Sequence, residues 1–232
     1  MKDSWGLLGR DLKEAFGGIW SFTRAHWVLY TVVVVVTLAI AFGWMFPNDL
    51  KWIEEGAPKE DSWMKAFAYQ ASDIGDGRLF LLLLIVLRLV AGFLGKRKLQ
   101  KLVALYFAVC LTTSMIARVG KNLTSRPRPK AAISEGISHT QFMGPSWSPS
   151  KYHSFPSGHT ATSMSSALPV VATAHPVIGV PVAVMGVSCA WSRFYTRNHY
   201  VSDIFVSSVV SVLVSWAGVA SYKRREKAEA KG

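Results

Sequence analysis

Three short groups of residues in this chain carry side chains suited to phosphate chemistry. They are Lys121 with Arg126 and Arg128, then Pro156-Ser157-Gly158-His159, then Arg193 with His199 and Asp203. Fixed Lys and Arg side chains neutralise phosphate oxygens and stabilise the charge that develops during phosphoryl transfer. Histidine and aspartate supply nucleophiles, bases and proton donors. The residue types therefore predict an enzyme site that binds and cleaves a phosphate ester.

The spacing within the groups suggests a task for each side chain. His199 and Asp203 are four residues apart and share a helix face, so the carboxylate can hold one ring nitrogen while the other attacks. His159 is placed to protonate a leaving oxygen. Pro156 suits the first turn of a helix, and Gly158 lets the backbone amides of that turn approach an anion.

The groups are far apart in the sequence, so helices must bring them together. Six apolar segments approach the length of about 20 residues that a bilayer core requires. They are Trp27–Phe46, Leu79–Leu94, Leu102–Val119, His159–Ala174, Val177–Trp191 and Asp203–Ala220. In an all-α bundle of six transmembrane helices, Lys121, Arg193 and the two histidines lie at span ends on one membrane face. The sequence thus predicts a single site at one face of an integral membrane bundle.

Composition also favours a membrane protein. Of the 232 residues, 50% are hydrophobic and 17% are charged, which is fewer charges than a soluble globule usually has, and disorder is excluded. The net charge of +12 then indicates contact with anionic lipid or phosphate, and no nucleic-acid partner is predicted. Cys110 and Cys189 lie in apolar runs outside any metal-binding spacing, so no metal site and no cofactor are predicted.

The distribution of basic residues predicts the topology. Lys and Arg gather before residue 27, between residues 96 and 101, and after residue 222, so both termini are expected in the cytoplasm. The site is then expected on the periplasmic face of a bacterial inner membrane. The first domain, residues 1–26, is predicted to contain an interfacial amphipathic helix over residues 4–20. Residues 27–222 are expected to form the six-span domain, with its catalytic part at about 117–205, and residues 223–232 a basic cytoplasmic tail.

The three groups match, in order and spacing, the signature KxxxxxxRP, PSGH and SRxxxxxHxxxD. Over about residues 79–220 the chain thereby resembles the type 2 phosphatidic acid phosphatase superfamily, in its integral-membrane lipid phosphatase branch. The resemblance implies that His199 forms a phosphohistidine, that Asp203 orients it and that His159 protonates the leaving group, without a metal. It also implies that phosphate is bound by Lys121, Arg128, Ser157, Gly158 and Arg193.

The expected substrate is a membrane lipid that carries a phosphate or diphosphate. Undecaprenyl diphosphate, phosphatidylglycerol phosphate, phosphatidate and a lipid A phosphate all fit, because the motifs describe only the shared phosphoryl group. A phosphotransferase would use the same residues and pass the phosphoryl group to an acceptor lipid instead of water. An anion transporter would need a site open to both faces, and no broken helix pair favours that alternative. The sequence carries no signal for oligomeric state.

A few other residues have two interpretations. Arg126 precedes a proline at a spacing that the signature does not select, and it is a candidate helper in phosphate binding. Arg88 is expected to snorkel or to have a buried partner. Asp73, Asp76 and the glycines beside them are expected to cap a helix rather than contact substrate. Aromatic residues of the long segment 121–155 are expected to line the entrance to the site; they are Phe142, Trp147, Tyr152 and Phe155.

Overall fold

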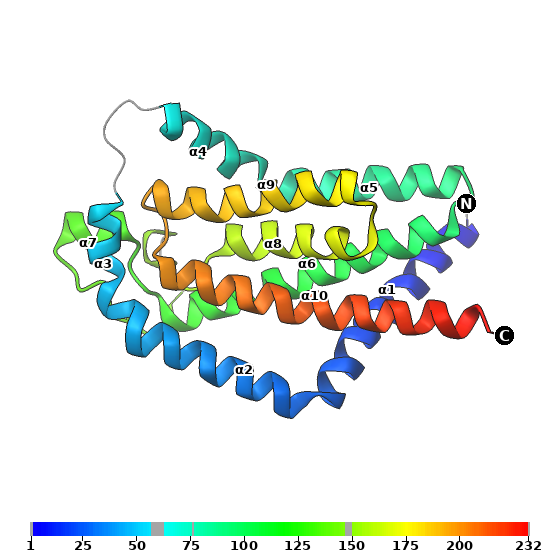
Figure 1. The fold of residues 1–232 in the computed structure, drawn as a ribbon, viewed down its shortest axis with the longest axis horizontal. Helices are drawn as coiled ribbons and strands as arrows, with labels where there is room; N and C mark the ends of the chain where they lie inside the picture. The colour runs from blue at the N-terminus through cyan, green and yellow to red at the C-terminus, as the bar shows by residue number, and fades with distance from the viewer. Residues whose placement is uncertain (1, 57–62, 76, 147–149, 232) are drawn as a thin grey trace.

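The regular elements are all helices in the computed structural model, which describes residues 2–56, 63–75, 77–146 and 150–231 (Figure 1). The longer elements are α1 (Lys2–Ala25), α2 (Trp27–Ile40), α3 (Phe46–Glu55), α4 (Trp63–Ile74), α5 (Gly77–Phe93), α6 (Arg97–Thr124), α7 (Pro129–Glu135), α8 (Gly158–Thr173), α9 (Pro176–Tyr195) and α10 (Val201–Glu229). A π-helical segment, Ala41–Met45, joins α2 to α3, and Ser150–Tyr152 forms one 3-10 turn. The all-α class predicted from the sequence is confirmed.

The six apolar segments predicted as spans are helical, except that Leu94 and Ala174 lie one residue beyond the ends of α5 and α8. Among the described residues, four stretches are long and apolar enough to cross a membrane: Trp27–Glu55, Arg97–Glu135, Pro176–Tyr195 and Val201–Glu229. The other two segments lie in α5 and α8, which have 17 and 16 residues. At 1.5 Å per residue, α8 is about 24 Å long, shorter than a bilayer core of about 30 Å. The count of six spans therefore stays a prediction.

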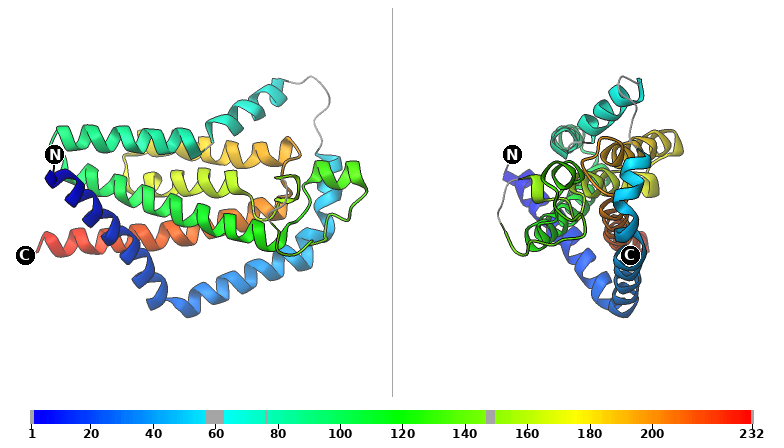
Figure 2. Two further views of the ribbon diagram at one scale, coloured as in Figure 1. Left: turned by 180° about the vertical axis from the view of Figure 1, so that it is seen from behind. Right: turned by 90° about the vertical axis from the view of Figure 1, so that its left-hand side faces the viewer.

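The centre of the bundle is α8, which packs against α6, α9 and α10 (Figure 2). Small residues allow this packing, because they let helix backbones approach closely. A Cβ on Gly186 of α9 would lie 3.0 Å from the Cβ of Ala167 on α8. Ser163 of α8 donates a hydrogen bond of 3.3 Å to the Gly186 carbonyl. These contacts hold α8 closely against α9.

The N-terminal helix α1 covers Lys2–Ala25, which is longer than the residues 4–20 over which we predicted an amphipathic helix. Its buried residues Ala15, Ile19 and Phe22 pack in one apolar cluster with side chains of α6 and α10. Asp11, which is 3% exposed, forms ion pairs with Arg88 of α5 at 2.9 Å and with Arg97 of α6. The expected buried partner of Arg88 is therefore Asp11. The interfacial placement of α1 stays a prediction, and the Trp5 side chain lies outside the described part.

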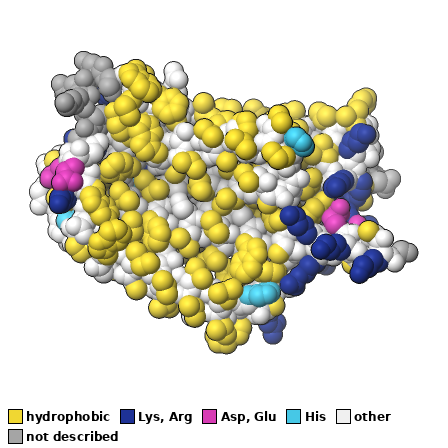
Figure 3. Space-filling model, in the orientation of Figure 1, with side chains coloured by type: hydrophobic (Ala, Val, Ile, Leu, Met, Phe, Trp, Pro, Cys, Tyr) yellow, Lys and Arg dark blue, Asp and Glu magenta, His cyan; other side chains and the backbone are white. Residues whose placement is uncertain are grey.

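Three short helices, α3, α4 and α7, were not expected from the sequence. Helix α7 interrupts the segment 121–155, and α4 packs against α9. At the other end of the chain, α10 continues through Glu229, so most of the segment expected as a basic tail is helical. Both termini lie at the same end of the bundle (Figure 1). Lys and Arg side chains gather at that end, next to a broad apolar surface (Figure 3).

Candidate active site

The end of the bundle opposite the termini holds the residues of the three sequence groups. Backbone hydrogen bonds tie the segments together: Ser157 N donates to Asp203 O at 3.2 Å, and Ser154 N donates to Arg126 O at 3.0 Å. The turn between α9 and α10 closes when His199 N donates to Arg193 O at 3.0 Å. The end of α6, the starts of α8 and α10 and the end of α9 therefore meet in one place.

His199 and Asp203 form a buried pair at this junction. Both side chains have no exposed surface, and His199 Nδ1 lies 3.5 Å from Asp203 Oδ2. Both ring nitrogens are buried, and neither has a hydrogen-bond partner among the described residues, so Nδ1 is in contact with the carboxylate and Nε2 is open to a reacting group. Burial lowers the pKa of His199 well below 6.5, so the imidazole is neutral at pH 7. A neutral ring with one nitrogen beside a carboxylate has the arrangement that a nucleophilic or basic histidine needs.

Several donors fix the Asp203 carboxylate. Ser154 Oγ donates to Oδ2 at 2.5 Å, and the backbone N–H of Tyr200 donates to the same oxygen at 2.9 Å. The second oxygen, Oδ1, accepts a hydrogen bond of 2.7 Å from Arg126 Nη1. Because both oxygens are held, the carboxylate has a single orientation toward His199.

Three cations face the same region. Lys121 interacts electrostatically with Arg128, Arg193 and Asp203, and Arg128 acts on His199 as well. The Nε atoms of Arg128 and Arg193 are buried, and neither has a hydrogen-bond partner within the described part of the chain. Like charges repel each other when they are partly desolvated, so this arrangement is suited to an anion placed between them.

The start of α8 completes this region. Ser157 is the N-cap residue, and its Oγ accepts hydrogen bonds from Thr160 Oγ1 at 2.9 Å and from Thr160 N at 3.4 Å. A Cβ on Gly158 would lie 3.2 Å from Lys121 Nζ, so the absence of a side chain leaves room for the ammonium group. The N-terminus of α8 and a Lys side chain therefore point into the same space, which favours an anion there.

An apolar cavity of about 430 Å³ lies beside this helix start, between α5, α6 and α8. Gly158 and His159 line it. Its other walls include Arg78, Phe80, Leu81, Leu84, Phe107, Leu111, Ser114 and Thr162. Leu81 and Leu111 are 42% and 38% exposed, so the cavity reaches the outer apolar surface. His159 therefore lines this apolar channel, and it directly follows Gly158, which faces Lys121.

Arg126 does not take the place expected of a helper in phosphate binding. Its side chain has no exposed surface and forms ion pairs with Asp203 at 2.7 Å and with Asp49 at 2.9 Å. The guanidinium also stacks between the rings of Phe46 and Tyr200, 3.9 and 4.0 Å from their centroids. Both faces and both ends of the guanidinium are therefore occupied. Arg126 holds the Asp203 carboxylate in place and has no free side for a phosphate.

Asp49 at the start of α3 is the main residue that the sequence analysis missed. It is fully buried, pairs with Arg126, and accepts a hydrogen bond of 3.1 Å from the backbone N–H of Ser202 and another from its hydroxyl group. The sequence shows Asp49 among other acidic residues of an apparent loop, where nothing distinguishes it. The only indication of a buried partner was Arg126, a basic residue to which the signature assigns no role.

Helix α4 contributes Ser72, whose Oγ accepts a short hydrogen bond from Arg193 Nη1. Asp73 is exposed, and Asp76 lies outside the described residues. A Cβ on Gly75 would lie 2.0 Å from Cys189 Sγ, so this glycine serves close packing of α4 on α9.

The described aromatic residues of segment 121–155 do not line the cavity beside His159, contrary to our expectation. Phe142 and Phe155 pack with Phe42 and Phe46 in a cluster of rings, and they do not line the cavity beside His159. Tyr152 donates a hydrogen bond of 2.8 Å to Glu135. Trp147 lies outside the described residues.

Comparison with known proteins adds one positive finding. The PAP2 superfamily matches residues 101–227, which is more than half of the chain and includes all three sequence groups. No curated protein and no solved structure matches the chain.

Proposed function

This chain belongs to the PAP2 superfamily, and on that premise we propose that it is a membrane phosphatase that hydrolyses a phosphomonoester or diphosphate on a lipid. The observation that carries the proposal is the contact between two environments at the start of α8. A cationic region surrounds His199, and an apolar cavity leads from His159 to the exposed Leu81 and Leu111. A lipid phosphate has a charged head and an apolar chain, and it fits such a pair.

In the proposed reaction, Nε2 of neutral His199 attacks phosphorus and the bond to the leaving oxygen breaks. The leaving oxygen takes a proton from His159. Asp203 accepts the hydrogen bond of Nδ1–H and stabilises the positive charge on the phosphorylated ring. Water then attacks the phosphohistidine with His159 as base, inorganic phosphate leaves, and neutral His199 is restored. The contact of 3.5 Å between Nδ1 and Asp203 Oδ2 supports this division of roles.

We assign phosphate binding to Lys121, Arg128 and Arg193, together with Ser157 and the amide of Gly158. Arg offers two parallel donors to phosphate oxygens, and Lys a compact charge. The unpartnered Nε atoms of the two arginines support the assignment, because a bound phosphate would satisfy them. Such donors stabilise the charge of the transition state.

The direct test is phosphate release by the purified protein from a panel of lipid phosphates and diphosphates. We expect His199→Ala to lower turnover by about 10⁴-fold or more and to abolish labelling of the protein by ³²P-substrate. His175→Ala is the matched control, because His175 caps α9 at the other end of that helix. Full turnover by His199→Ala would overturn the covalent mechanism.

Three further measurements test the proposal. Labelled phosphate that appears in an acceptor lipid, rather than as inorganic phosphate, would identify a phosphotransferase. A chelator is expected to leave the rate unchanged, because the proposed steps use only side chains of this protein. His159→Ala should slow esters with poor leaving groups far more than p-nitrophenyl phosphate, whose leaving group needs no proton.

A further inference from the structure

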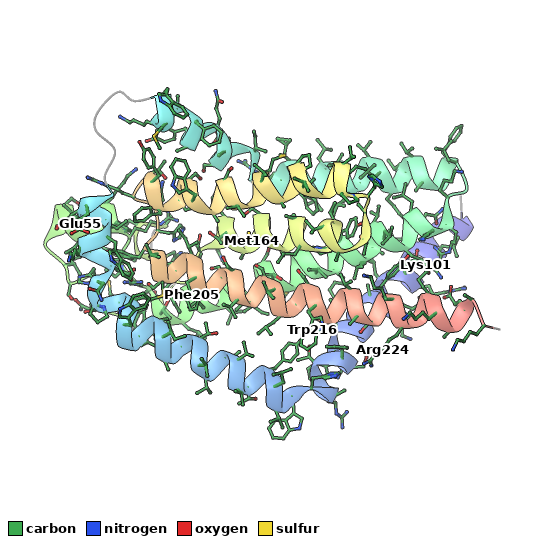
Figure 4. The ribbon with its side chains drawn as sticks, in the orientation of Figure 1. Glu55, Lys101, Met164, Phe205, Trp216 and Arg224 are labelled. Atoms are coloured by element: carbon green, nitrogen blue, oxygen red, sulfur yellow. The ribbon has the colours of Figure 1, made fainter. Side chains whose placement is uncertain are left out.

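A second cavity, of about 630 Å³, lies between α1 and the C-terminal part of α10, at the end of the bundle that holds the termini. Four cationic side chains line it: Arg10 and Lys13 from α1, and Arg224 and Arg225 from α10. Glu14 is its one acidic residue. Figure 4 shows Arg224 at this end, far from Glu55 at the opposite end. The cavity therefore has an excess of positive charge and is separate from the candidate active site.

The walls of this cavity are built by close helix packing. A Cβ on Gly18 would lie 2.8 Å from Arg225 Nη1 and 2.9 Å from Ser221 Cβ, so only glycine allows this approach. Ser221 Oγ donates a hydrogen bond of 2.7 Å to Gly18 O, and Arg225 Nη1 donates to Glu14 O. Arg225 is thereby fixed, whereas Arg10, Lys13 and Arg224 are exposed and able to contact a ligand.

The surroundings of the cavity indicate an amphipathic ligand. Trp20, on the same stretch of α1, is 70% exposed, and Trp27 is 64% exposed. Exposed tryptophan side chains are typical of the membrane–water interface. Figure 3 shows that the Lys and Arg side chains at this end border a broad apolar surface. The cavity therefore lies where lipid headgroups are expected.

An apolar hollow adjoins the cationic cavity. It has a volume of about 440 Å³ and is lined by residues 25–29 and Val32. The two spaces share a wall, because Phe22 lines the first, His26 lines the second, and their rings stack with centroids 4.1 Å apart. A ligand with a negative head and an apolar chain would occupy both spaces.

From this arrangement we propose that the cavity between α1 and α10 binds the phosphate headgroup of an anionic phospholipid, with an acyl chain in the hollow at residues 25–32. Basic pockets between membrane helices bind anionic headgroups in this way. The site differs from the candidate active site in position and in its residues, so its occupancy does not depend on the phosphatase proposal.

The test uses the full-length protein in nanodiscs of phosphatidylcholine, with and without phosphatidylglycerol. We expect phosphatidylglycerol to raise the thermal unfolding temperature of the wild type. Its affinity should fall as the salt concentration rises. The triple variant Arg10→Gln, Lys13→Gln, Arg224→Gln should lose about fivefold in affinity per charge, on the order of 100-fold in total. Its matched control is Lys223→Gln, Lys227→Gln, Lys231→Gln, which removes the same charge at the same end but outside the cavity.

A second variant tests the cavity without a change of charge. Gly17 lines the cavity, and a Cβ at this position would meet nothing within 4 Å, so Gly17→Leu should fill the space and weaken phosphatidylglycerol binding at least about tenfold. Gly9→Leu, on the same helix but outside the cavity, is the control and should bind normally. Equal losses in the charge variant and its control would overturn the proposal. So would full stabilisation by inorganic phosphate or glycerol phosphate, because the ligand would then be a free anion.

Discussion

Arg126 lies between two buried carboxylates, and this arrangement determines what each of the three side chains can do. The Asp203 side chain contacts His199, while the Asp49 side chain contacts the other terminal nitrogen of the guanidinium. All three side chains have no exposed surface, so water screens none of the charges. Replacing one member leaves an uncompensated charge in a medium of low dielectric constant.

We predict that Arg126→Met destabilises the protein by about 3–5 kcal/mol, because Asp49 and Asp203 would remain buried without their cation. Thermal unfolding of the purified protein measures this loss. Adding Asp49→Asn should recover part of the stability, since one of the two orphaned charges is removed. Lys130→Met on the exposed face of α7 is the control and should change the unfolding temperature little. An Arg126→Met protein as stable as wild type would contradict the ion-pair arrangement.

The protonation of His199 gives a prediction for pH dependence. Burial lowers its pKa well below 6.5, so the ring stays neutral as the pH falls through 6.5 and loses its nucleophilic nitrogen only at lower pH. The acid limb of kcat/KM should therefore lie below pH 6.5. The unfolded chain also binds this proton more tightly, so folding stability falls in the same acidic range.

The measurement compares two phosphate esters whose own ionisation constants differ. A limb that both substrates share belongs to the enzyme rather than to the substrate. A shared limb at or above pH 6.5 would show that His199 is not the neutral group proposed here.

At the scale of elements, the short helix α4 holds Arg193 in place. Ser72 on α4 accepts a hydrogen bond from Arg193, and Gly75 brings the end of α4 against Cys189 of α9. The position of Arg193, which we propose to bind phosphate, thus depends on a helix outside the four membrane-length stretches.

We predict that Gly75→Ala separates α4 from α9, because its Cβ would lie 2.0 Å from Cys189 Sγ. The expected cost is about 1–3 kcal/mol of stability. KM should rise more than kcat falls, since Arg193 is assigned to binding. Unfolding temperature and steady-state kinetics measure the two effects.

Two variants make this prediction specific. Gly92→Ala on α5 has nothing within 4 Å of the new Cβ and should leave both quantities close to wild type. Cys189→Ala combined with Gly75→Ala should recover part of the loss, because it removes the closest atom. A Gly75→Ala protein with wild-type stability would contradict the close packing of the two helices.

The sequence predicted the long helices well, because apolar runs such as Val177–Trp191 have no stable alternative to a helix in lipid. It also placed His199 beside Asp203, although the shared helix face that it predicted is wrong, because His199 lies in the turn before α10 and only Asp203 lies in the first turn of that helix. It missed α3, α4 and α7, which are short and mix polar with apolar residues. It missed Asp49 because the pairing with Arg126 joins residues 77 positions apart, and no local pattern records such a contact.

At the scale of the whole molecule, charge and apolar surface are divided along the long axis. Exposed apolar side chains cover the middle, and Lys and Arg gather at the end with both termini (Figure 3). Cytoplasmic ends of membrane proteins carry an excess of such residues. We therefore propose that the termini face the cytoplasm and the candidate active site faces the opposite side.

Single cysteines test this orientation in intact cells. We predict that Ser134→Cys, exposed on α7, reacts with a membrane-impermeant maleimide, whereas Lys227→Cys, exposed on α10, reacts only after the membrane is opened. The wild type, with Cys110 and Cys189, gives the background. The reverse pattern would place the site in the cytoplasm.

The short length of α8 has a consequence for biosynthesis. Its 16 residues include several hydroxyl-bearing side chains, so it lacks the length and hydropathy by which the translocon recognises a span on its own. Only Ala174 and His175 separate it from α9, which has both properties. We expect α8 to enter the bilayer together with α9 as a helical hairpin. Insertion of α8, the central helix of the bundle, would then depend on α9, which is translated after it.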